Sequence, residues 1–539
     1  MNAFHTKLIR PAAALLIAAV SLISCSQYEF GYLYEDLPFE MTKVTRPQIP
    51  DREVNIADFG GVGDGVTLNS EAFANAIEAL SQRGGGRLTV PTGVWLTGPI
   101  TLKDNIELHI RPDAVLLFST DRDLYPIIET VFEGLDTKRC LPPINADGAK
   151  NIAITGGGTI DGNGDAWRQV KKSKIAPSQW KKLLASGGYT NAKGDIWYPD
   201  STSIRGSIVS DAFNVPQGLT TDAEWESVKT YLRPVLIGLK ECENVLLEDC
   251  LFQNSPCWNI HPLMCKNLII NNVTVRNPWY SQNGDGLDVD SCENTLVINS
   301  SFDVGDDAIC IKSGKDADGR RRARPCRNLI VDNCIVFHGH GGFVVGSEMS
   351  GGVENISVTN CRFLGTDVGL RFKSCRGRGG VVRNIYIEDI VMMNIPTEPL
   401  LFDLHYGGKS AVEAAEEDPA SKYDVEFVPA DETTPQFRDI YIKDVVCSGA
   451  ARAMYFNGIP EKNIENIVVE DCKIVSTKGA DLRYANGVVL KNIDITQSTG
   501  KGYSFANCCN VFVEDCKDAS GADLLDVFQY NSQNLTIDR

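Results

Sequence analysis

Short runs in which apolar and polar residues alternate recur along most of the chain. A typical run is Asn328-Leu329-Ile330-Val331-Asp332, and little of the surrounding sequence has the three-to-four residue spacing of a helix. Alternation with a period of two is the pattern of a β-strand, because successive side chains point to opposite faces. The pattern therefore predicts an all-β protein built from many strands of three to five residues.

These strands belong to a repeated unit. A phrase of the form Cys/Val-x-Asn-apolar places asparagines at positions 244, 267, 294, 328, 355 and 384, at intervals of 23, 27, 34, 27 and 29 residues. Strands this short cannot bury their faces within one unit, but stacked coils satisfy both the backbone and the apolar faces. Asparagine suits the turns and can form a hydrogen-bonded ladder. A parallel β-helix is predicted, whereas a leucine-rich repeat is disfavoured by variable coil length and the lack of a leucine consensus.

Two segments depart from the repeat. Residues 70–80 have the pattern of one amphipathic helix that stops at Gly84-Gly85-Gly86, and we expect it to cap the open end of the solenoid. Residues 163–232 contain four tryptophans and scattered lysines, and they form an insertion in a β-helix domain spanning 51–539. This insertion either walls a substrate groove or is a packing flap.

The first 25 residues read as a targeting segment. Lys7 and Arg10 precede an apolar run at 12–23 that is too short to span a bilayer. The ending Leu22-Ile23-Ser24-Cys25 resembles the lipobox of bacterial lipoproteins, which implies lipidation of Cys25; the alternative is an ordinary signal peptide cleaved near Ser24. Residues 26–50 are predicted to be a tether. We expect export to the bacterial cell envelope, with membrane contact only through the N-terminal lipid.

Composition narrows the possible partners. The formal net charge of −18 argues against nucleic acid, because phosphate binding needs a basic face. Of the 17 cysteines, many recur in one setting such as Glu-Asp-Cys250, which predicts small buried side chains stacked in successive coils. A few disulfide bridges remain possible. No cysteine spacing is typical of a zinc site, and we expect neither metal nor cofactor.

Four motifs between residues 283 and 373 exceed what stacking requires. Their order is Asn283-Gly284-Asp285-Gly286, Gly305-Asp306-Asp307, Gly339-His340-Gly341 and Arg371-Phe372-Lys373. Asp285 precedes the aspartate pair by about one coil, so the three acids should lie side by side. Clustered carboxylates repel one another, so such a cluster is unfavourable for stability and indicates a functional role. Asp-Gly turns or a calcium-binding pair are the structural alternative, but four motifs in order favour a functional site.

These motifs resemble those of glycoside hydrolase family 28, the polygalacturonases. The opening segments Ala57–Val66 and Leu96–Pro99 resemble the family's N-terminal coil, while Gly284 and Phe372 differ from the usual threonine and isoleucine. The resemblance implies a right-handed, pectin-lyase-like solenoid and inverting hydrolysis of α-galacturonosyl linkages in a pectic polysaccharide. It makes Asp306 the general acid, and makes Asp285 and Asp307 the groups that hold and deprotonate water. Neighbouring negative charges are expected to raise the pKa of Asp306.

The remaining motif residues are expected to tune the acids and bind substrate. His340 would hydrogen-bond within the acid cluster. Arg371 and Lys373 share one face of a strand and can grip a uronate carboxylate. Substrate binding is further assigned to Asn283, Lys312 and Tyr406. The basic run that continues from Lys312 through residues 315–324 is either a solvated loop or an electrostatic guide for a polyanion.

Two glycine-rich segments predict whether the protein cleaves the polymer at its ends or at internal linkages. Gly346–Gly352 and Arg376–Gly380 resemble the exo-acting bacterial branch, and the 163–232 insertion could close one end of the cleft. Two other functions stay open at this point. One is a pectate lyase, which would need calcium and an arginine base, and the other is a non-catalytic glycan-binding β-helix whose aspartates are turn residues.

Overall fold

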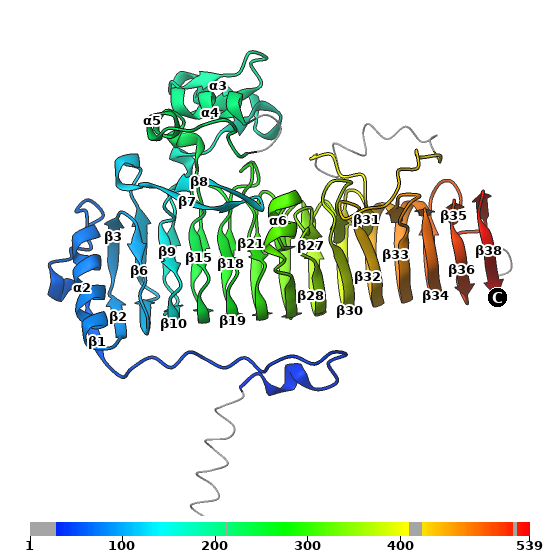
Figure 1. Ribbon diagram of the computed structural model, residues 1–539, viewed down its shortest axis with the longest axis horizontal. Coiled ribbons are helices and arrows are strands. Elements are labelled where there is room, and N and C mark those ends of the chain that lie inside the picture. Colours follow the sequence, from blue (N-terminus) through cyan, green and yellow to red (C-terminus); the bar gives the residue numbers. More distant parts are fainter. Residues whose placement is uncertain (1–28, 211–213, 409–422, 521–524, 539) are drawn as a thin grey trace, which may run out of the picture.

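The computed structural model describes residues 29–210, 214–408, 423–520 and 525–538, and they form one long solenoid (Figure 1). Strands pair in parallel with the strand one coil later. For example, β16 (Glu243–Glu248) pairs with β19 (Lys266–Asn271), which pairs with β22 (Glu293–Ile298). β25 (Cys326–Asp332) and β28 (Val353–Leu364) continue the series. The predicted right-handed parallel β-helix is confirmed.

The asparagine ladder was predicted from the repeat, and the structure contains it. Asn267 Nδ2 donates to Asn244 Oδ1 at 3.0 Å, and Asn294 Nδ2 donates to Asn267 Oδ1 at 3.1 Å. Asn328 continues the series with a bond of 3.1 Å to Asn294. These asparagines have φ near +58°, the left-handed region that asparagine tolerates better than most residues. The repeated phrase thus fixes one turn of each coil.

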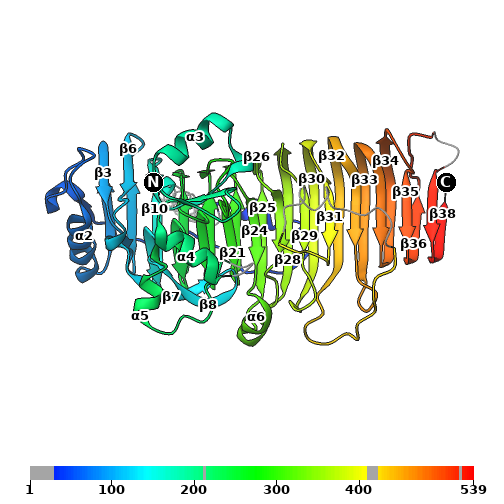
Figure 2. The same cartoon turned by 90° about the horizontal axis from the view of Figure 1, so that it is seen from above.

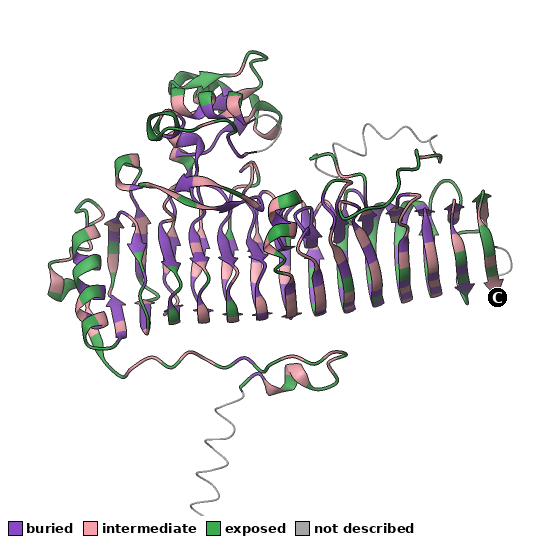
Figure 3. Ribbon diagram, in the orientation of Figure 1, coloured by how far each residue is buried: buried purple, intermediate pink, exposed green. Residues whose placement is uncertain are grey.

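Buried apolar side chains form one continuous core inside the solenoid. Figure 3 shows that buried residues occur in successive coils. The sixteen cysteines that the structure describes are all free, and most are buried. Cys265 Sγ, for example, lies 3.2 Å from the carbonyl oxygen of Leu239 in the preceding coil. The prediction of small buried side chains, rather than a disulfide framework, is confirmed for this part of the chain. Cys25 lies outside the described residues.

The N-terminal end is capped as expected. Helix α2 (Ser70–Gln82) buries Phe73, Ile77 and Leu80 against the first coil, which contains β1 (Glu53–Asn55) and β2 (Gly86–Val90). Among the described residues, no helix has the length and apolar character needed to cross a membrane.

Residues 29–50, which belong to the predicted tether, pack against the side of the solenoid. Phe30 and Val44 pack on outward-facing Leu246 and Ile269 of the solenoid flank. Arg46 forms two bonds of 2.7 Å to Glu248. Apolar residues of this segment cover the flank, and this is why the segment is docked along the coils (Figure 1).

The 163–232 insertion forms a lobe above the coils (Figures 1 and 2). It contains α3 (Pro177–Ala185), α4 (Ser201–Val209), α5 (Asp222–Glu226) and a small sheet of β12 (Val170–Lys171), β13 (Tyr189–Thr190) and β14 (Ile196–Tyr198). Trp180 and Trp197 pack together in one small core, and Trp167 and Trp225 pack in another that also includes Tyr125 and Cys140 from outside the insertion. A second excursion, which sequence did not predict, is the antiparallel hairpin of β7 (Ile127–Phe132) and β8 (Leu135–Cys140).

Candidate active site

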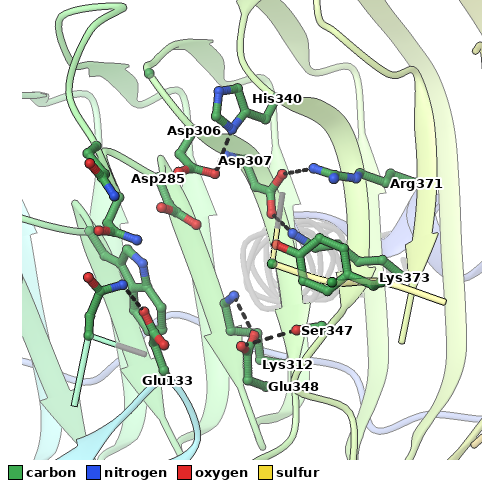
Figure 4. A pocket seen from close by; sticks show the side chains of 18 of the residues that line it. Glu133, Asp285, Asp306, Asp307, Lys312, His340, Ser347, Glu348, Arg371 and Lys373 are labelled. Carbon is green, nitrogen blue, oxygen red and sulfur yellow. Dashed lines mark hydrogen bonds and ion pairs between the residues drawn. The ribbon is translucent and has the colours of Figure 1, made fainter. Parts of the chain in front are cut away.

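A cavity of about 550 Å³ lies on one face of the solenoid, above the middle coils (Figure 4). Two strands, β24 (Asp307–Lys312) and β29 (Leu370–Lys373), line the cavity, together with residues that adjoin β21 (Leu287–Asp290) and β27 (Gly341–Gly346). These strands pair in the order β21, β24, β27 and β29. The volume falls within the range of about 300–1,000 Å³ that is usual for ligand pockets. All nine residues predicted for catalysis and substrate binding line it, namely Asn283, Asp285, Asp306, Asp307, Lys312, His340, Arg371, Lys373 and Tyr406.

Three carboxylates meet at the centre of the cavity. One oxygen from each of Asp285, Asp306 and Asp307 lies within 4.8 Å of the others. The coil register causes this meeting, because the Gly286 backbone N–H donates to the Asp307 carbonyl at 2.9 Å and locks the two motifs side by side. Asp285 is 3% exposed and Asp307 is 1% exposed. The predicted clustering of the acids is therefore present in the fold.

Asp306 is paired with His340. The Nδ1 atom of His340 lies 3.1 Å from Asp306 Oδ1 (Figure 4). Burial alone would raise the pKa of Asp306, but the charge of His340 and its hydrogen bond outweigh burial, and the pKa lies below its usual value. The expectation of a raised pKa is therefore wrong for the enzyme without substrate. It considered the neighbouring acids but not the imidazole and the two cations nearby.

The raised pKa values belong to Asp285 and to Asp288, which sequence reasoning did not single out. Burial is the main cause for both, and their mutual repulsion adds to it for Asp285. Asp288 is fully buried, and neither of its carboxylate oxygens has a hydrogen-bond partner among the described residues. The cavity thus brings a carboxyl with a raised pKa, Asp285, beside Asp306 and Asp307, whose pKa values are lowered. That is the arrangement that acid–base catalysis requires.

Arg371 and Lys373 compensate Asp307. Lys373 Nζ lies 2.6 Å from Asp307 Oδ2, and Arg371 Nη1 lies 3.3 Å from Asp307 Oδ1. Burial would raise the pKa of Asp307, but these two cations outweigh it and lower the pKa. The ring of Tyr406 lies over both cations, with its centroid 5.0 Å from Lys373 Nζ and 5.6 Å from the guanidinium carbon of Arg371. A cationic, aromatic-lined contact for an anion adjoins the carboxylates.

The two departures from the family pattern have structural reasons. A side chain at Gly284 would collide with Ser281 Oγ, so this chain needs glycine there. The neighbouring Asn283 adopts φ +54°, and its Oδ1 accepts a bond of 2.9 Å from Arg233 Nη2. Phe372 points inward and stacks on Phe402 with centroids 4.5 Å apart. Neither departure removes a polar group from the cavity.

The basic run after the aspartate pair divides into two parts. Lys312 and Lys315 reach the cavity, where Lys312 Nζ bonds Glu348 at 3.0 Å and lies 4.7 Å from the Trp258 ring. Arg321 and Arg322 do not line the cavity and instead pair with Asp136 at 2.6 Å. Sequence reasoning missed Trp258, Glu348 and four residues from the two excursions. Those four are Glu133, Lys171, Lys174 and Asn214.

A cation is geometrically possible at the three carboxylates, whose oxygens are close enough to share one. Two of these carboxylates already have positive partners, because Lys373 contacts Asp307 and His340 contacts Asp306. The charge balance therefore needs no metal ion, and the cluster is better suited to proton transfer.

Comparison with known proteins gives a consistent set of relatives. The profile of "Glycosyl hydrolases family 28" matches residues 221–517. A probable polygalacturonase of Vitis vinifera is 28% identical over 86% of this chain and 81% of its own. An exo-poly-alpha-D-galacturonosidase of Dickeya chrysanthemi is 27% identical over 78% and 67%. The crystal structure of an exopolygalacturonase from Thermotoga maritima is 34% identical over 84% and 93%, with a TM-score of 0.68.

Proposed function

The chain belongs to the glycosyl hydrolases of family 28, and we propose that it is an exo-acting enzyme that hydrolyses α-galacturonosyl linkages in pectic polysaccharides. One observation carries the proposal. The cluster of Asp285, Asp306 and Asp307 shares its cavity with Arg371 and Lys373. The carboxylates can supply the acid and base of glycoside hydrolysis, and the two cations can hold the carboxylate of a uronate.

We assign the proton donor to Asp306 and the base to Asp307. In the free site His340, Lys373 and Arg371 keep the pKa of Asp306 low. A bound uronate adds a negative charge and engages both cations, so it raises the pKa of Asp306 and favours the protonated acid. The low pKa of Asp307 leaves it ionised and able to take a proton from water. Asp285, whose pKa is raised, is suited to hold that water rather than to deprotonate it.

The stereochemical outcome follows from the number of acids rather than from their spacing. Carboxyl groups about 5 Å apart are typical of retaining enzymes, and about 6.5–9.5 Å is typical of inverting ones. Here the nearest oxygens are within 4.8 Å. A retaining enzyme needs only one carboxylate besides the donor, whereas this cavity supplies two, Asp285 and Asp307. Two acids beside the donor can instead hold water between them, which favours inversion.

Proton NMR of the reaction tests this assignment. With galacturonan as substrate, we expect monomeric galacturonate as the first product, in the β configuration, followed by mutarotation. The same measurement on rhamnogalacturonan oligomers identifies the preferred neighbouring sugar. Accumulation of the α anomer first would show retention, and a mixture of longer oligomers would show internal cleavage. Unsaturated products that absorb ultraviolet light would instead show a lyase, and pectin binding without release of sugar would show a glycan-binding protein.

Exo-action is supported by the wall that the two excursions add to the cavity and by the Thermotoga maritima relative. The insertion contributes Lys171, Lys174 and Asn214 to the cavity wall, and the β7–β8 hairpin contributes Glu133. Lys174 Nζ lies 3.5 Å from His340 Nε2, so the wall reaches the catalytic cluster itself. A polymer that enters such a cavity can place only its terminal residues beside the acids.

We also propose that the protein is lipid-anchored through Cys25 in the bacterial cell envelope. The sequence before Cys25 supports this, although it lies outside the described residues. Residues 29–50 dock on the flank of β16 and β19, whereas the cavity is lined by residues of β24 and β29. An anchor preceding that segment leaves the cavity accessible to polymer. Labelled palmitate should be incorporated into the wild-type protein and not into Cys25→Ser; equal labelling of both would contradict the anchor.

A further inference from the structure

The tip of the β7–β8 hairpin is seated on the loop that follows β24. Phe132 pairs with Leu135, so the turn consists of Glu133 and Gly134, with φ of +47° and +72°. Both residues are left-handed, which is the geometry of a tight two-residue hairpin turn. The Lys315 backbone N–H donates to the Gly134 carbonyl at 3.1 Å. A side chain at Gly134 would collide with the Lys315 backbone, so the contact is close and depends on glycine.

Arginines of the basic run hold this tip in place. Arg321 and Arg322, on α6 (Asp316–Arg322), both pair with Asp136 at 2.6 Å. The Asp136 backbone N–H donates to Asp318 Oδ2 at 3.1 Å, and Arg322 also donates to the Gly134 carbonyl. Exposed ion pairs are individually weak, but several that converge on one tip, together with backbone bonds, fix its position. The basic run is thus largely a clamp for the hairpin.

The clamp places a carboxylate in the wall of the cavity. Glu133 is 9% exposed and lines the same cavity as the three aspartates. Its Oε1 accepts a bond from Asn214 Nδ2, and its Oε2 lies 3.8 Å from Lys315 Nζ. Figure 4 shows the Glu133 carboxylate in the cavity. A glutamate in the left-handed region is uncommon, and such backbone positions are often kept for a functional reason. A negative group here is unexpected if the cleft continued along a polyanion.

The non-reducing terminal residue of a galacturonan differs from an internal residue in what is attached to its O4 atom. The polymer continues through O4 of each sugar, so only the non-reducing terminal residue has a free 4-hydroxyl. A hydroxyl can donate to a carboxylate, and such a bond is stronger than a neutral one. A further galacturonate linked at O4 would instead bring its own carboxylate toward Glu133 and be repelled.

Building on the proposed exo-hydrolase function, we propose that Glu133 determines specificity for chain ends. Its carboxylate accepts a hydrogen bond from the free 4-hydroxyl of the terminal galacturonate and excludes a longer chain at that position. The β7–β8 hairpin and the α6 arginines act as positioning elements for this carboxylate. Glu133 does not take part in bond cleavage.

A pair of trisaccharides tests the proposal. Saturated trigalacturonate has the terminal 4-hydroxyl, whereas its 4,5-unsaturated analogue lacks it. We expect Glu133→Gln to lower kcat/KM for the saturated substrate by about 10- to 100-fold, the usual size of one hydrogen bond to a charged group. The already slow cleavage of the unsaturated analogue should change by less than about threefold, since there is no hydroxyl to lose.

The matched control is Glu129→Gln, an exposed glutamate on the same hairpin that does not line this cavity. It should behave as wild type on both trisaccharides. Glu133→Asp, which tolerates the left-handed turn better but is shorter, should repeat the selective loss. An equal loss on both substrates in these variants would overturn the role of Glu133. If the wild-type protein cleaves neither trisaccharide, the proposed function itself fails, which is a distinct result.

Discussion

Asp306→Asn is expected to lower kcat on trigalacturonate by about 10²- to 10⁴-fold, the range for loss of a general acid. The amide has nearly the same shape but cannot donate a proton to the leaving oxygen. It can still lie beside His340 Nδ1, which is 3.1 Å from the carboxylate in the native site. KM should therefore change little, because the cations that hold the uronate are untouched. Initial rates from reducing-sugar release over a range of substrate concentrations separate the two constants.

Asp303→Asn is the matched control for this variant. Asp303 ends β23 (Ser301–Asp303), three residues before Asp306, and does not line the cavity. It should keep wild-type activity. If Asp306→Asn releases sugar as fast as wild type, Asp306 is not the proton donor. Asp285, whose pKa is raised in the free site, would then be the next candidate.

The solenoid could be predicted because its determinants are local and repeated. Asn267, Asn294 and Asn328 each occupy the same left-handed turn, and the hydrogen bond between neighbours links equivalent positions of adjacent coils. The repeated Cys/Val-x-Asn-apolar motif therefore specifies the strand length, the turn and the stacking of the coils. Coil spacing then places residues 21 or 22 apart side by side, which is why Asp285 and the aspartate pair could be expected together.

The wall that the two excursions add to the cavity could not be predicted in this way. Gly134 contacts Lys315, and Asn214 contacts Glu133, across 181 and 81 residues that include two excursions from the repeat. The Glu-Gly turn resembles many surface turns, and its partner arginines resemble a solvated loop. Only the folded arrangement shows that these two unremarkable sequences meet. The docking of residues 29–50 was missed for the same reason, because it depends on a distant flank.

The directions of the pKa shifts of the aspartates could not be predicted from the sequence either. The motifs show that other aspartates neighbour Asp306, and their negative charges predicted a raised pKa for it. The folded site adds the direction of each side chain: His340 faces Asp306, and Lys373 faces Asp307. The raised pKa values fall on Asp285 and Asp288, for which burial outweighs nearby positive charge, although Lys312 Nζ lies 3.5 Å from Asp288 Oδ1. Electrostatic roles depend on distances of a few ångströms, and coil spacing alone does not supply them.

A net charge of −18 does not prevent binding of an acidic polymer, because the cations are gathered where the substrate enters. Arg371 and Lys373 are nearly fully buried and adjoin Tyr406, so solvent screens their charge weakly. They have two functions in the proposed mechanism. They hold the uronate, and they keep Asp307 ionised in the free enzyme. Removing one of them should therefore change both affinity and pH dependence.

Lys373→Met is expected to lower kcat/KM on trigalacturonate by about 10²- to 10³-fold, since loss of one partner in a buried charge pair costs about 2–5 kcal/mol. The loss should be much smaller on a methyl-esterified trisaccharide, which has no carboxylate to hold. Burial raises the pKa of Asp307, and Lys373 is the largest influence that lowers it. Without Lys373 the pKa of Asp307 rises, so the base is ionised only at higher pH. The acidic limb of the kcat/KM profile should then move toward higher pH.

Lys443→Met, which removes an exposed lysine on β32 (Gln436–Asn457), is the control for loss of one positive charge. It should leave both the profile and the preference for free acid unchanged. A weakened Lys373→Met enzyme with the wild-type acidic limb would mean that Lys373 binds substrate without controlling Asp307. An equal loss on the esterified and free substrates would mean that the charge of Lys373 acts on the cluster alone. The two functions are separable because esterification removes the charge of the substrate and leaves the charge of Asp307 in place.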